Sequence, residues 1–168
     1  MYERILVPLD GSKVGEAAIP NVENLALKLA TGNEVEVTLL QVISDMTFDF
    51  LTDDESAQLP YSEVDLKVIE GMAQRYLGKI AERLAKKGIK VKILVKEGHA
   101  ADEIIKSAQE INANLIAMST HGRSGLGRWA MGSITDKVLH ESTVPVLTVR
   151  ATERQPKVEP HTHTAISI

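Results

Sequence analysis

The chain has 168 residues, with 19 Lys and Arg against 23 Asp and Glu, so its net charge is −4; it contains no cysteine. The length suits one domain, and the hydrophobic fraction of 43% is typical of a folded protein. The lack of cysteine excludes disulfides, thiolate zinc sites and a cysteine nucleophile. Mild acidity argues against nucleic-acid binding, and no signal segment or long apolar run indicates secretion or a membrane span, so we expect a cytoplasmic protein.

Short apolar runs alternate with helical periodicity along the first part of the chain. Ile5–Leu9 is predicted to be a strand that is buried on both faces. Apolar residues recur at helical spacing from Lys13 to Ala30, and Pro20 predicts either a kink or a late start of this helix. Alternation over residues 35–42 predicts a second strand. An acidic stretch without Lys or Arg follows, and we interpret residues 44–60 as a loop.

The middle of the chain repeats this alternation. Steps of three and four predict an amphipathic helix from Leu66 to Leu84, closed by Gly88. Apolar residues alternate with lysines over residues 89–95, which are predicted to be a strand at a sheet edge. A helix over residues 101–111 and a buried strand over residues 114–119 are predicted next.

The last part contains the glycines. Residues 120–132 are Gly-rich, residues 133–141 are predicted to form a short helix, and residues 144–149 a final strand. Residues 151–168 lack periodicity and contain two prolines, so we expect a mobile tail after a domain of residues 1–150. Strands that alternate with helices predict an α/β fold, a Rossmann-like open parallel sheet with helices on both faces.

Ligands of open parallel sheets bind beyond the carboxyl ends of the strands, where the winding reverses. Turn residues gather at two such ends, Pro8–Ser12 and Ser119–Ser133. In the second, glycines lead into a helix that Ser133 opens, with Asp136 three residues later in a capping-box pattern. Because a helix N-terminus offers unpaired N–H groups and partial positive charge, this segment can bind a phosphate.

Other interpretations of the Gly-rich segment stay open. The glycines could form only a flexible connector, Arg123 and Arg128 could be surface residues, and Ser133 could be no more than a helix cap. The spacing fits neither a Walker loop nor the dinucleotide Gly-x-Gly-x-x-Gly pattern.

Two motifs together resemble the universal stress protein family, over Met1 to about Arg150. The first is the run Ile5–Ser12, and the second is Ser119–Gly125 followed by Gly132-Ser133 and by Val144–Leu147. Members of the family that bind ATP carry Gly, two residues, Gly, nine residues, Gly, then Ser or Thr. Here Gly122 and Gly132-Ser133 fit that pattern, whereas Ser119 stands where the pattern has its first glycine.

The resemblance implies the sheet order 3-2-1-4-5 and a bound ATP, ADP or AMP, with Mg or Mn possible on the phosphates. It assigns Asp10 to the adenosine, the backbone of Val42 to the adenine edge, and Met118 and Ser119 to the base and ribose. The full set of implied cofactor-binding residues is Pro8, Leu9, Asp10, Val42, Met118, Ser119, Gly122, Gly132, Ser133, Ile134 and Thr135. Asp10 could instead only form a turn before Gly11, and Val42 and Met118 could be ordinary core residues.

The resemblance also implies a homodimer through the last strand, Val144–Val149, and a short apolar edge strand favours such pairing. Coverage of this edge by the tail is the alternative. No convincing catalytic set is present, because His121 stands alone in the Gly-rich segment and His161 and His163 lie in the tail. We therefore expect an ATP-binding stress-response sensor or interaction module with an unknown protein partner. The alternatives are a slow ATP hydrolase and a partner-binding module without nucleotide.

Overall fold

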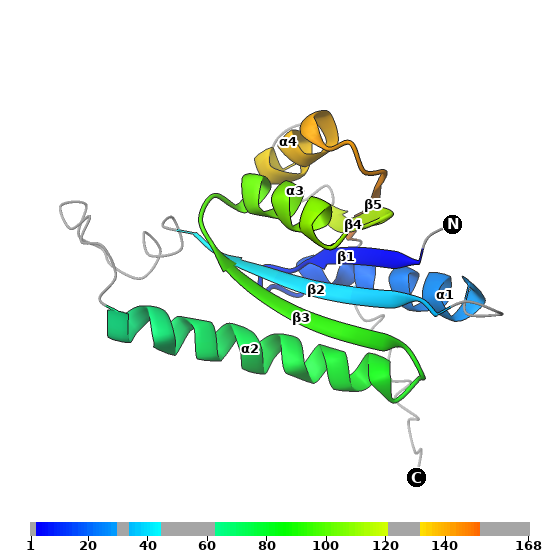
Figure 1. Ribbon diagram of the computed structural model, residues 1–168, viewed down its shortest axis with the longest axis horizontal. Helices are drawn as coiled ribbons and strands as arrows, with labels where there is room; N and C mark the ends of the chain where they lie inside the picture. Colours follow the sequence, from blue (N-terminus) through cyan, green and yellow to red (C-terminus); the bar gives the residue numbers. More distant parts are fainter. Residues whose placement is uncertain (1–2, 30–33, 45–62, 121–131, 152–168) are drawn as a thin grey trace, which may run out of the picture.

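The computed structural model describes residues 3–29, 34–44, 63–120 and 132–151 (Figure 1). Five parallel strands form one sheet in the order β3-β2-β1-β4-β5, which confirms the predicted fold class and order. The strands are β1 (Arg4–Pro8), β2 (Glu36–Ile43), β3 (Lys90–Glu97), β4 (Leu115–Thr120) and β5 (Val146–Arg150). The helices are the 3₁₀ helix η1 (Gly15–Ala18) and α1 (Ile19–Leu29), α2 (Glu63–Ala85), α3 (Ala100–Glu110) and α4 (Ser133–Glu141).

Helices cover both faces of the sheet, as Figure 1 shows. On one face α1 and α2 pack against alternate residues of β1 and β2, with Ile5, Val37 and Leu77 fully buried. On the other face α3 and α4 pack against the intervening residues of the strands, among them Leu6. Because side chains alternate along a strand, the continuous apolar runs of β1 and β4 supply both cores.

Proline sets where the first helix begins. The chain forms the 3₁₀ turn η1 first, and α1 then begins at Ile19, immediately before Pro20. Proline is tolerated in the first turn of a helix because the N–H groups there lack intrahelical partners. Of the two outcomes predicted for Pro20, the structure has the late start.

β3 is an edge strand, as predicted, and its lysines form ion pairs with neighbouring elements. Lys92 pairs with Glu36 of the neighbouring β2 at 2.9 Å, and Lys96 pairs with Glu110 of α3 at 2.9 Å. The hydrogen bond from Lys92 lowers the pKa of Glu36 below its ordinary value. Charged side chains of this kind discourage pairing of an edge strand with other chains.

Two predictions at the end of the chain were wrong. The last strand begins at Val146 rather than Val144, since the Ser142 hydroxyl forms a turn with the backbone N–H and carbonyl of Val144. The capping box is absent: the N-cap of α4 is Gly132, no side chain of the described residues caps it, and the Asp136 N–H donates to the Gly132 carbonyl. Ser133 is therefore the first helical residue, with its own N–H directed out of the helix.

Several predicted segments lie outside the described residues. They are the helix end at Gly32, the acidic stretch after Ser44, most of the Gly-rich segment with Gly122 and His121, and the tail after Ala151. None of the described helices is both long enough and apolar enough to cross a membrane.

Candidate functional site

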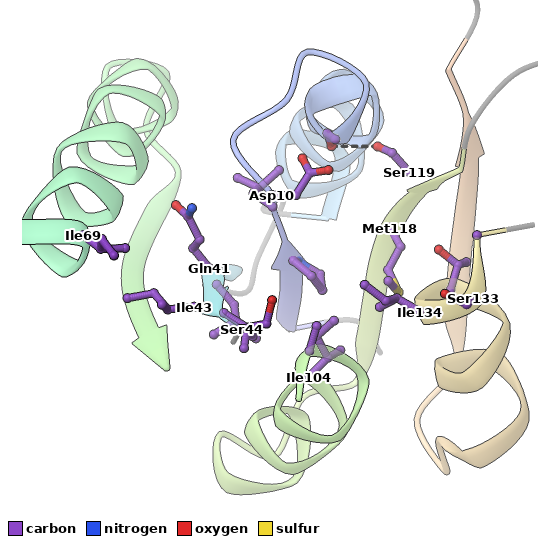
Figure 2. A pocket seen from close by; sticks show the side chains of 18 residues that line it. Asp10, Gln41, Ile43, Ser44, Ile69, Ile104, Met118, Ser119, Ser133 and Ile134 are labelled. Atoms are coloured by element: carbon purple, nitrogen blue, oxygen red, sulfur yellow. Dashed lines mark hydrogen bonds between the residues drawn. The ribbon is translucent and has the colours of Figure 1, made fainter. Parts of the chain in front are cut away.

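A cleft of about 410 Å³ lies at the carboxyl ends of β1, β2 and β4 (Figure 2). After β1 the chain winds to β2 on one side, and β4 and β5 continue on the other side of β1. The cleft therefore lies at the reversal of winding, where the topology of a parallel sheet leaves a crevice. Its volume falls in the range of pockets that hold small molecules.

At one end of the cleft, β2 extends beyond its neighbour β1. The last residue pair between them is Pro8 with Leu40, whereas β2 continues to Ile43. Hydrogen bonds from Glu36 N–H to the Glu3 carbonyl and from Leu9 N–H to the Leu40 carbonyl show that even-numbered residues of β2 face β1. By this alternation, the N–H and carbonyl of Val42 point to the side where β1 has ended. Val42 thus offers a donor and an acceptor at the cleft.

The walls at this end are mostly apolar. Leu9 and Met118 are each 5% exposed, and Ile104 of α3 is 3% exposed. The side-chain oxygen of Gln41 also lies here; it is buried and has no hydrogen-bond partner among the described residues. A flat apolar group with polar atoms on its rim suits such walls.

The other end of the cleft is the N-terminus of α4. Gly132, Ser133, Ile134 and Thr135 line it, and Figure 2 shows Ser133 and Ile134 on the first turn of this helix. The first N–H groups of a helix have no partner within it, and no described side chain caps this one. Together with the partial positive charge of a helix N-terminus, this turn can bind an anion.

Between the two ends runs a connection from β1 to α1, residues 9–18, which we call the β1–α1 loop. The Asp10 carboxylate accepts hydrogen bonds from the Ser12 N–H at 2.9 Å and the Ser12 hydroxyl at 2.7 Å. The turn role that the sequence left open for Asp10 is therefore present, and Asp10 lines the cleft at the same time.

Of the eleven predicted site residues, the structure brings ten together around this one cleft. They are Pro8, Leu9, Asp10, Val42, Met118, Ser119, Gly132, Ser133, Ile134 and Thr135. Gly122 lies outside the described residues. That these residues bind a ligand stays a prediction.

Several lining residues were not predicted. Gln41 and Ile43 flank Val42 on the overhanging end of β2, and Ser44 follows the strand; they could have been found by noting that β2 is the longer strand. Ile69 and Ala100 come from α2 and α3, whose placement over the cleft no local pattern indicates.

Negative charge gathers behind the β1–α1 loop. Burial, together with the nearby carboxylates of Glu16 and Asp10, raises the pKa of Tyr76 to about 12. The described residues contain no group of three or more His, Asp or Glu side chains that could hold a metal ion.

Comparisons with known proteins place the chain in a family. The model of the universal stress protein family matches residues 1–150. Universal stress protein MJ0531 of Methanocaldococcus jannaschii is 30% identical over 155 residues, which cover 92% of this chain and 86% of that protein. Universal stress protein MJ0577 of the same organism is 32% identical over 160 residues, covering 89% of this chain and 96% of that protein.

Solved structures share the fold. The structure of MJ0577 has a TM-score of 0.71 at 31% identity and covers 90% of this chain and 98% of its own. A universal stress protein family protein from Arabidopsis thaliana, solved with AMP bound, has a TM-score of 0.60 at 14% identity and covers 94% of this chain and 97% of its own. The family model and the relatives agree over nearly the whole described chain, and the protein belongs to the universal stress protein family.

Proposed function

We propose that this protein binds an adenine nucleotide, ATP or its products ADP or AMP, and acts as a nucleotide-dependent sensor or interaction module in the stress response. The observation that carries the proposal is the pairing of two features in one cleft. The N-terminus of α4, which no described side chain caps, lies at one end, and the backbone of Val42, which has no partner on its β1 side among the described residues, lies at the other. The first suits phosphates and the second suits the edge of a base.

The phosphate end would act through backbone N–H groups. Residues 133–135 present them at the first turn of α4, and the hydroxyls of Ser133 and Thr135 stand beside them. Gly132 is the N-cap, and its lack of a side chain lets a phosphate approach the backbone. By the resemblance, Gly122 would add to this grip. A Mg or Mn ion would be held by phosphate oxygens and water.

The base end would act through shape and one polar edge. Adenine carries an amino group next to a ring nitrogen, which matches the acceptor and donor that Val42 presents side by side. Leu9 and Met118 would pack against the faces of the ring. Pro8 and Asp10 would border the adenosine, with Ser119 near the ribose. AMP in the Arabidopsis relative gives a precedent within the fold.

A slow hydrolase is the second candidate, and a partner-binding module without nucleotide is the third. Hydrolysis would need a base beside the terminal phosphate; the one sequence candidate, His121, lies outside the described residues. We also propose a homodimer through β5, whose Leu147 is 36% exposed at the sheet edge, and a cytoplasmic location.

Titration calorimetry with Mg-ATP tests the proposal. We expect one site per chain, and a weakening of about tenfold each for Ser133→Ala and Thr135→Val, since each removes one hydroxyl hydrogen bond to a phosphate. Thr143→Val, an exposed threonine outside the cleft, is the matched control and should bind as the wild type does. Absence of heat and of thermal stabilisation by Mg-ATP would refute nucleotide binding and favour the partner-binding module. Sustained phosphate release that His121→Ala abolishes would favour the hydrolase.

A further inference from the structure

Ser119, near the end of β4, holds the β1–α1 loop through its hydroxyl. We propose that Ser119 is a positioning residue, which fixes this loop as a preformed wall of the cleft before any ligand arrives. The inference rests on the proposed nucleotide site and adds to it a residue that acts through the loop.

The hydroxyl of Ser119 bridges two backbone groups that lie more than one hundred residues away in sequence. It donates to the Gly15 carbonyl at 2.7 Å and accepts from the Ala18 N–H at 2.9 Å. Figure 2 shows the side chain directed toward the loop, with the hydrogen bond drawn as a dashed line. The hydroxyl is thus turned to the loop, which explains how a serine fits where a glycine would leave space.

From Gly15 the hydrogen bonds continue to the other side of the cleft. The Gly15 N–H donates to the Ser12 hydroxyl at 2.9 Å, and that hydroxyl donates to the Asp10 carboxylate at 2.7 Å. A chain of hydrogen bonds therefore joins the end of β4 to Asp10 at the end of β1. Both Asp10 and Gly15 line the cleft, so the position of its wall depends on this chain.

The link at Ser119 is the one that the loop cannot easily replace. Ala18 is fully buried; without the hydroxyl, the Ala18 N–H and the Gly15 carbonyl would keep only local bonds within η1 and would lose their link to β4. The loop would then gain freedom to leave its present position. Because apparent affinity falls in proportion to the fraction of molecules in the binding-competent form, a loosened wall weakens binding without loss of any ligand contact.

The test compares Ser119→Ala with Ser119→Thr, which keeps the hydroxyl. Ser142→Ala is the matched control, since the Ser142 hydroxyl also bridges two backbone groups, at 3.0 and 3.1 Å, but outside the cleft. Mg-ATP affinity is measured by calorimetry well below the melting temperature of every variant. Hydrogen exchange of the amides of residues 15–18 is measured without nucleotide.

We expect Ser119→Ala to bind Mg-ATP about tenfold more weakly, equivalent to about 1.4 kcal/mol, and to lose protection at the Ala18 amide. Ser119→Thr should keep the protection of the Ala18 amide, because it keeps the hydroxyl. Ser142→Ala should keep wild-type affinity, even where it melts at a lower temperature. A purely structural role would lower the melting temperature of Ser119→Ala and leave its affinity unchanged, and that result would overturn the inference.

The positioning role of Ser119 can also be tested if Ser119→Ala does not fold, or if the wild type does not bind Mg-ATP. Should Ser119→Ala fail to fold, Ser12→Ala breaks the same chain at another link and is expected to give the same loss of affinity; unchanged affinity would overturn the inference. If the wild type binds no Mg-ATP, the proposed function fails by itself. The exchange experiment then decides the positioning role: lost protection of residues 15–18 in Ser119→Ala supports it, and unchanged protection refutes it.

Discussion

Replacing Gly15 by alanine tests the packing of the β1–α1 loop directly. A Cβ at this position would lie 2.2 Å from Oδ1 of Asp10 and 3.2 Å from its Cγ, so the carboxylate must move by at least 0.8 Å to reach even a 3.0 Å contact. Oδ1 is the atom that accepts both hydrogen bonds from Ser12. The methyl group therefore displaces the acceptor on which the turn depends.

The expected change in the free energy of unfolding follows from the hydrogen bonds that Gly15→Ala disturbs and from the conformational freedom that it removes from the unfolded chain. Loss or distortion of two hydrogen bonds to a partly solvated carboxylate costs about 2 kcal/mol, and the smaller conformational freedom of unfolded alanine returns roughly 0.4–1 kcal/mol. We expect Gly15→Ala to lower the free energy of unfolding by about 1–1.5 kcal/mol. It should also weaken Mg-ATP binding, because Asp10 borders the proposed adenosine site.

Urea denaturation followed by circular dichroism measures the change. Gly78→Ala is the matched control: it makes the same substitution inside α2, where nothing lies within 4 Å of the new Cβ. There alanine should stabilise the protein by about 0.5–1 kcal/mol, since glycine is a poor helix former. A Gly15→Ala protein that is as stable as Gly78→Ala would refute the steric reasoning.

Three other predictions concern the helices, the buried phenol and the sheet edge. The ammonium group of Lys137 lies 2.6 Å from Asp102 and lowers the pKa of that carboxyl below 3.8, so Asp102→Asn should be less stable than the wild type at neutral pH. The difference in urea midpoint between the two proteins should vanish as the pH falls through the pKa of Asp102 in the folded state. A difference in midpoint that persists below this pKa contradicts the assignment. Tyr76 has a buried hydroxyl without a partner among the described residues, so Tyr76→Phe should be at least as stable as the wild type at pH 7. Because the phenol pKa rises from 10.0 to about 12 on folding, the wild type should lose more stability than Tyr76→Phe as the pH rises between those values. Equal alkaline losses of the two proteins in urea titrations would argue against this. On β5 the N–H of Thr148 points away from β4, toward the open edge of the sheet, so Thr148→Pro should sediment as a folded monomer. Val149→Pro instead removes a hydrogen bond to β4 and should unfold the protein. A dimer that survives Thr148→Pro excludes pairing through this edge.

Strong local signals predicted most of the fold. The α4 bounds match the predicted residues 133–141, because the Gly-rich segment ends at Gly132 and the helix begins directly after it. The late start of α1 follows from Pro20, whose missing N–H decides where a helix can begin. The lysines of β3 identified an edge strand before any topology was known.

Predictions failed where two local rules compete. Ser133 has the side chain of a good cap, but Gly132 adopts the extended conformation that precedes the helix, with φ −54° and ψ 142°, and takes the cap position. Ser119 and Gly15 meet only because β4 lies beside β1, so their hydrogen bond could not be read from either segment alone. Such long-range contacts complete the cleft, whereas the motifs indicate only some of the segments that line it.

A crystal structure grown in saturating Mg-ATP would show directly where the nucleotide binds. We expect phosphate oxygens within hydrogen-bond distance of the backbone N–H groups of residues 133–135, and the adenine edge against the N–H and carbonyl of Val42. Phosphates bound elsewhere on the protein, or a cleft filled by its own side chains with no nucleotide in it, would refute nucleotide binding at this cleft.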